Sequence, residues 1–168
     1  LEFCAKNGLN TGYFIVYPRK DAAPRYQKFL KDWKKAGWKH KPKIAYSTLV
    51  YVDTTDKKAI DKSLQQAARA YEGFLPDALP GECFEDRVAR YTQKFVDRGE
   101  DGAASIMANI FDPEYLMDND LVFIGSPETV TKKLRKYAEE GVFNTFMGEF
   151  NFAELNEKEV MRSITLFG

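Results

Sequence analysis

The sequence has little of the residue types on which many functional sites depend. Its 168 residues include one histidine, His40, and two separated cysteines, Cys4 and Cys83. A zinc site draws on several Cys and His side chains at close spacing, so no metal set is visible. Two isolated cysteines indicate free thiols in a reducing compartment, and the cytoplasm is the expected location. A disulfide between the two cysteines remains an alternative, but nothing in the sequence pattern favours it.

Net charge and long apolar runs are also missing. Lys and Arg number 25, and Asp and Glu number 25. Binding to nucleic acid relies on a basic excess, so nucleic acid is not expected as a partner. The basic cluster at residues 31–43 is better explained as the solvated end of a helix. No apolar run approaches the roughly 20 residues of a transmembrane helix. No signal peptide is recognised, and no membrane partner is expected.

Aromatic residues, in contrast, are abundant, with 13 Phe and 9 Tyr. They fit either a well-filled core or a pocket for a flat cofactor. Composition alone favours the core.

Along most of the chain, segments with the hydrophobic period of a β-strand alternate with segments that have the period of an α-helix. Strands are predicted at residues 9–17, 43–52 and 142–149, because these runs are aromatic and β-branched. Helices are predicted from their apolar stripes and end signals. They span residues 21–36, 56–74, 126–140 and 156–167. Such alternation indicates an α/β fold with parallel strands.

Residues 75–122 interrupt this alternation. Prolines, glycines and two shorter helical stripes predict a helical and loop insert that adds no strand to the sheet. Three strands make a thin domain, whereas a (β/α)₈ barrel has eight strands and about 250 residues. Residues 1–168 therefore fit one partial domain, the C-terminal part of a TIM barrel. Leu1 also begins inside what reads as a helix, so either residues are missing upstream or an unusual N-terminus has been processed.

Several segments, in order, resemble the bacterial luciferase-like, flavin-dependent monooxygenases. They are "EFCAKNGL" at 2–9, "VYVDTTDKKA" at 50–59, "GSPETV" at 125–130, the Gly-Val turn at 141–142 with its strand, and "SITLF" at 163–167. No single motif is specific, but together they cover the chain.

The resemblance implies a reaction that uses reduced FMN, supplied by a separate flavin reductase, and dioxygen to oxygenate a small organic substrate. It also implies that the catalytic histidine and the loop for the flavin phosphate lie upstream of Leu1. No catalytic residue is assigned to this chain. The 168 residues alone are expected to be inactive and to associate with a missing N-terminal half or with another copy. The alternatives are a deazaflavin-dependent oxidoreductase of the same superfamily and a non-catalytic flavin-binding or structural relative.

The C-terminal ends of the strands are where barrel enzymes place their chemistry. Phe14, Val16, Phe146, Gly148 and Glu149 are therefore the candidate cofactor-binding residues, with core packing the common alternative for the apolar ones. Gly148 would let a ligand approach closely.

Other candidates have simpler interpretations. Asp53 would pair with Glu149 as acid and base only in a common pocket, and a helix cap is favoured instead. Ser126 begins a helix whose N-terminus would attract phosphate. Glu128 already places a negative charge at this positive end of the helix dipole and would repel a phosphate. His40 lies before a strand, at the opposite end from barrel chemistry, and is expected to be an exposed surface residue.

Overall fold

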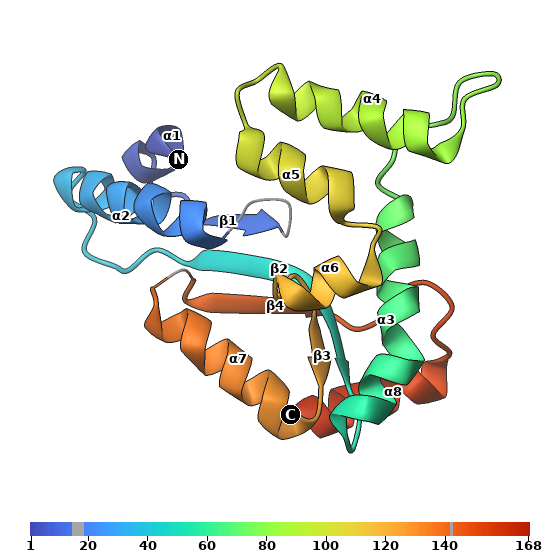
Figure 1. Ribbon diagram of the computed structural model, residues 1–168. Helices are drawn as coiled ribbons and strands as arrows, with labels where there is room; N and C mark the ends of the chain where they lie inside the picture. The colour runs from blue at the N-terminus through green and yellow to red at the C-terminus, as the bar shows by residue number, and fades with distance from the viewer. Residues whose placement is uncertain (15–18, 142) are drawn as a thin grey trace.

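The computed structural model describes residues 1–14, 19–141 and 143–168. Its sheet contains β1 (Thr11–Phe14), β2 (Ile44–Val52), β3 (Phe123–Gly125) and β4 (Thr145–Glu149). All paired strands run parallel, with β2 at the centre (Figure 1). The predicted parallel arrangement of the strands at 9–17, 43–52 and 142–149 is confirmed. Residues 15–17 and 142 of those predictions lie outside the described part of the chain.

The strand β3 was missed by the sequence prediction, which read the segment before Ser126 as a turn. Phe123, Ile124 and Gly125 form it and are buried. They pair with residues 50–52 of β2, whereas β1 and β4 pair with its first half. Three residues are too short to show a strand period, so only the pairing with β2 reveals it.

Helices follow the strands much as expected. They are α1 (Glu2–Lys6), α2 (Arg19–Lys35), α3 (Asp56–Glu72), α7 (Pro127–Glu139) and α8 (Glu157–Phe167). The caps explain where two of them start. Ser126 accepts a hydrogen bond from the backbone N–H of Thr129, and Asn156 forms a capping box with Glu159.

Residues 75–122 hold α4 (Phe84–Val96), α5 (Asp101–Asn109) and α6 (Pro113–Asp118). Figure 1 shows α4 and α5 side by side, with α4 on the outside of the molecule. The sequence predicted two helical stripes in this segment, and α6 is a third helix that it missed. Asp112 caps this helix by accepting a hydrogen bond from the backbone N–H of Glu114 at 2.9 Å, and Pro113 follows at its first position.

The two faces of the sheet pack into two separate cores. On one face, Tyr13, Tyr46 and Phe146 lie in one row across β1, β2 and β4, covered by α2 and α7. The rings of Tyr13 and Tyr46 are 4.9 Å apart, and Tyr26 of α2 lies 5.2 Å from Tyr13. The other core joins α3, α4 and α5 to Leu49. Because side chains alternate along a strand, this second face holds the residues between those of the first.

Several residues of the predicted apolar stripes are exposed instead of buried. Leu30 of α2 is 42% exposed and Ile164 of α8 is 41% exposed. Ile164 lies on α8 with the exposed Met161 and Phe167, which leaves this helix with an uncovered apolar stripe. Helical period alone does not show which apolar positions have a neighbouring element to pack against.

Within the described ranges, no helix is both long and apolar enough to cross a bilayer. The same residues contain no group of three or more His, Cys, Asp or Glu side chains placed to hold a metal ion. Cys4 and Cys83 are free thiols.

Candidate functional site

One row of side chains crosses three strands, on the face opposite the Tyr13 row. It starts at the C-terminal end of β1 and passes through the middle of β2 and β4. Phe14 of β1 pairs with Ser47 of β2, which pairs with Met147 of β4. Residues paired in a parallel ladder point to the same face of the sheet. Phe14 is half-buried and Met147 is 52% exposed. We call Phe14, Ser47 and Met147 the inner row.

Glu149 lies on the same face, one step further along β4. It pairs with Leu49 of β2 and is exposed. The C-terminal ends of parallel strands are where TIM-barrel enzymes bind their ligands. The inner row and Glu149 therefore combine two apolar side chains, Phe14 and Met147, with one carboxylate. Phe14 and Glu149 lie at the C-terminal ends of their strands.

Two other predicted site residues lie on the opposite face of β4. Phe146 stacks on Phe123 with ring centroids 5.3 Å apart. A Cβ at Gly148 would come within 2.9 Å of Phe150 and 3.0 Å of Val50. Close packing thus explains this glycine without a ligand. Val16 lies outside the described residues.

Tyr71 of α3 is a residue that the sequence prediction treated only as part of a buried stripe. Its side chain is 1% exposed. The hydroxyl lies beside Thr48 and Leu49 of β2 without a hydrogen bond of regular geometry. Burial, with a smaller contribution from the nearby Glu149 carboxylate, raises the pKa of Tyr71 far above its ordinary value. The phenol therefore stays protonated and can donate a hydrogen bond. A tyrosine ending a stripe of alanines was the only sequence signal.

Asp53 does not form the helix cap that was predicted. The cap of α3 is Thr55, which accepts a hydrogen bond from Lys58, and Asp53 instead accepts one from Arg162 at 2.9 Å. Asp53 also lines a hollow of about 510 Å³ beside α8, and Glu149 is not among the residues that form it. The alternative to the cap, an acid–base pair of Asp53 with Glu149, is therefore not assembled in this hollow.

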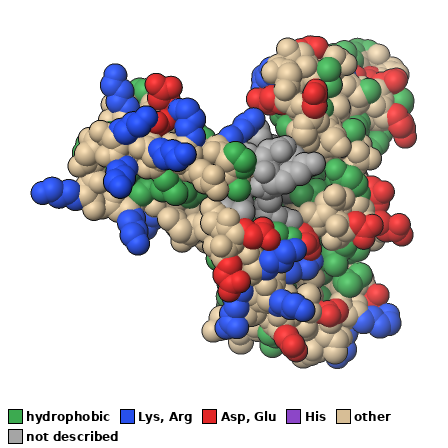
Figure 2. All heavy atoms as spheres, turned by 60° about the vertical axis from the view of Figure 1, so that its left-hand side comes forward, with side chains coloured by type: hydrophobic (Ala, Val, Ile, Leu, Met, Phe, Trp, Pro, Cys, Tyr) green, Lys and Arg blue, Asp and Glu red, His purple; other side chains and the backbone are tan. Residues whose placement is uncertain are grey.

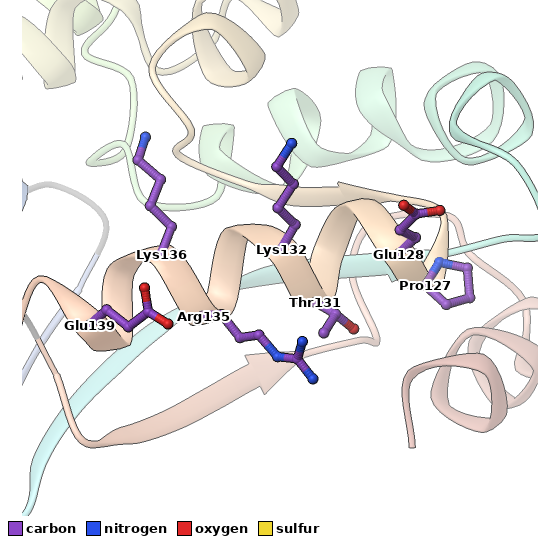
Figure 3. A pocket seen from close by; sticks show the side chains of 7 residues that line it. All are labelled: Pro127, Glu128, Thr131, Lys132, Arg135, Lys136 and Glu139. Carbon is purple, nitrogen blue, oxygen red and sulfur yellow. The ribbon is translucent and has the colours of Figure 1, made fainter.

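The N-terminus of α7 is already occupied by a carboxylate from another helix. Asp56 of α3 accepts hydrogen bonds from the backbone N–H of Ser126 and from the Thr129 hydroxyl. This carboxylate takes the position where a phosphate would bind. A hollow of about 610 Å³ runs along α7 from Pro127 to Glu139, and Figure 3 shows the side chains that line it. All seven of its side chains come from this one helix, so no second element shapes it.

His40 is exposed, as predicted, and contributes to packing. Its ring lies 5.1 Å from that of Trp33, whose indole N–H donates to the His40 carbonyl at 2.9 Å. Figure 2 shows Lys and Arg side chains gathered on the same arm of the molecule, over α2 and the loop after it. This arm lies at the N-terminal end of β2, away from the inner row.

Comparison with solved structures finds the same fold in known monooxygenases. The monooxygenase RslO1 from Streptomyces bottropensis matches 99% of the chain at 17% identity with a TM-score of 0.64. The oxygenating constituent of 3,6-diketocamphane monooxygenase from the CAM plasmid of Pseudomonas putida, solved in complex with FMN, matches 98% at 19% identity with a TM-score of 0.65. No protein-family model matches the chain, and neither does any curated protein.

The match covers 42% of the length of each of these two structures. The chain thus spans less than half of the proteins whose fold it shares, which are TIM-barrel enzymes. It has the fold of part of a TIM barrel, and the predicted resemblance to luciferase-like monooxygenases is confirmed at the level of the fold.

Proposed function

We propose that the chain forms one wall of a flavin-dependent monooxygenase that uses reduced FMN and dioxygen. The observation that carries this proposal is the inner row in a chain with the fold of such enzymes. Its two apolar side chains are Phe14, at the C-terminal end of β1, and Met147, two residues before the end of β4. The FMN in the Pseudomonas putida structure supports FMN as the cofactor here.

The residues of the inner row are better placed to contact the flavin ring than to bind the flavin phosphate. Phe14 and Met147 offer apolar contacts to a flat ring, and Met adapts its shape to an aromatic surface. The phosphate fits less well, because Asp56 already occupies the N-terminus of α7. We therefore assign ring contacts to this chain and the phosphate to residues outside it.

When bound, reduced FMN would supply the electrons that activate dioxygen for oxygenation of a small organic substrate. The chain's own residues would orient the ring and exclude water. Phe14 and Met147 would cover one surface of the ring. The neutral hydroxyl of Tyr71 would hold a proton beside the strand ends, with Glu149 at the solvent side. A flavin reductase would provide the reduced cofactor.

The test uses the protein expressed from the complete reading frame that contains these 168 residues. Under anaerobic conditions, reduced FMN and a reduced deazaflavin are titrated separately, and the affinity of each is measured by absorbance. FMN is expected to bind more tightly. Aerobic incubation with FMN, NADH and a flavin reductase should then transfer one oxygen atom from ¹⁸O₂ to a small ketone or aldehyde.

A protein that binds the deazaflavin but not FMN would contradict the assignment of the cofactor. A protein that binds neither would contradict the proposed function as a whole.

A further inference from the structure

A cavity of about 160 Å³ lies where β1 meets the helical segment 75–122. Phe14 of β1 forms one wall, and Tyr71 and Phe74 at the end of α3 form the next. Tyr91 and Phe95 of α4 and Met107 with Ile110 of α5 complete the lining. Elements from both sides of residue 75 are needed to enclose the cavity.

The lining is mostly apolar, with the hydroxyls of Tyr71 and Tyr91 as its polar side-chain groups. Phe14 meets Phe74 edge-on at 5.5 Å between ring centroids, and Phe74 stacks on Tyr71 at 5.9 Å. Met107 and Ile110 are 2% and 1% exposed. None of the seven lining side chains carries a charged group. Flat rings that are braced against one another do not collapse into the space between them.

Phe74 separates the cavity from solvent. It is 51% exposed, whereas most of the other lining side chains are buried. It follows the end of α3 in a short turn, so its ring is held less firmly than those within helices. A small molecule would enter past this side chain.

We propose that this cavity binds the hydrocarbon part of an uncharged organic substrate, of about the size of one six-membered ring. An apolar cavity of about 150 Å³ stays free of water and takes up benzene or xenon. Phe14 belongs both to the cavity and to the inner row, so a bound molecule lies beside the proposed flavin surface. Its role as substrate rests on the proposed function, whereas binding to the cavity does not.

The test measures whether benzene raises the melting temperature of the protein expressed from the complete reading frame that contains these 168 residues. A ligand that binds only the folded state raises it, and the increase grows with the logarithm of the ratio of free ligand concentration to dissociation constant. Wild type should melt several degrees higher with saturating benzene. Two filling variants, Ile110→Phe from the inside and Phe74→Trp from the exposed wall, should each lose most of this increase. Phe74→Trp alters a half-exposed position, so it tests the cavity even where Ile110→Phe does not fold.

Val88→Phe is the matched control. Val88 is on α4 but lines a different hollow, with Phe84 and Phe111. This variant should keep the full benzene effect. No increase in wild type, or an equal increase in wild type and Phe74→Trp, would overturn the cavity proposal. FMN affinity measured on the same samples separates the two proposals: benzene binding without FMN binding contradicts only the proposed function, and FMN binding without benzene binding contradicts only the cavity.

Discussion

The carboxylate of Asp56 accepts a hydrogen bond from the backbone N–H of Ser126 at 2.6 Å, which joins the first turn of α3 to the start of α7 across 70 residues of sequence. Its second oxygen accepts from the Thr129 hydroxyl at 3.0 Å. The two helices follow β2 and β3, which pair directly. This contact fixes the strand ends near the candidate site and fills the anion position at α7 with a protein carboxylate.

Asp56→Ala should lower the free energy of unfolding by about 1 kcal/mol, the usual loss when a side-chain oxygen at a helix N-terminus is removed. Urea denaturation gives this value. A double-mutant cycle with Thr129→Val serves as the control. If the hydroxyl and carboxylate interact as described, the two losses should be less than additive by about 0.5 kcal/mol or more. Fully additive losses would contradict the described contact.

The ion pair between Glu82 and Arg90 predicts a pH dependence in the segment before α4. Two Arg90 nitrogens donate to Glu82 at 2.6 and 2.8 Å. These hydrogen bonds lower the pKa of Glu82 to about 2 from its ordinary value of 4.5. A lowered pKa stabilises the folded protein above pH 4.5, and that contribution is lost as the pH falls from 4.5 towards 2.

Denaturation of wild type and Glu82→Gln over a pH series measures this contribution. The difference in unfolding free energy between them should be constant above pH 4.5 and shrink below it. A difference that persists unchanged at pH 2 would rule out the ion pair as its source.

Gly148→Ala should reduce stability without changing the cofactor affinity of the folded protein. The added Cβ would lie 2.9 Å from Phe150 and 3.0 Å from Val50, and such overpacking costs about 1–3 kcal/mol. Thermal melting and FMN titration of the same variant separate stability from binding. Unchanged stability with lost FMN affinity would instead support the sequence-based idea that this glycine admits a ligand.

The isolated 168-residue chain should self-associate, bind FMN poorly and show no monooxygenase activity. Large apolar side chains are exposed near both sides of the sheet. They are Leu1, Phe3 and Leu9 beside β1, and Met147, Met161, Ile164 and Phe167 beside β4. Burying such a side chain contributes about 1.5–3 kcal/mol, which favours association. Sedimentation velocity tests this, and a compact monomer that binds FMN tightly and oxygenates substrate would contradict it.

Local signals were sufficient to predict most of the elements. The caps Ser126 and Asn156 and the apolar periods located α7 and α8, because these signals depend on neighbouring residues alone. The strand β3 and the capping of α7 by Asp56 could not be predicted in this way. Both depend on contacts between segments about 70 residues apart.

The candidate site was predicted only in part for a similar reason. Sequence reasoning located the ends of β1 and β4 but not the face to which each side chain points. The register with β2 places Phe14 and Glu149 on the face of the inner row, and Phe146 and Gly148 on the face of the Tyr13 row. Tyr71 and the cavity depend on the packing of α3 against α4 and α5. No periodicity reveals such an arrangement.

The flavin surface proposed here can be tested with two equally exposed methionines. Met147 of the inner row is 52% exposed, and Met161 on α8 is 54% exposed. Each is replaced by Glu in the protein from the complete reading frame, and the FMN dissociation constant is measured by fluorescence quenching. Met147→Glu should weaken binding about tenfold, which corresponds to about 1.4 kcal/mol, because the bound ring would remove the carboxylate from water, while Met161→Glu should bind like wild type. Equal affinity in wild type and Met147→Glu would contradict the placement of the flavin on the inner row.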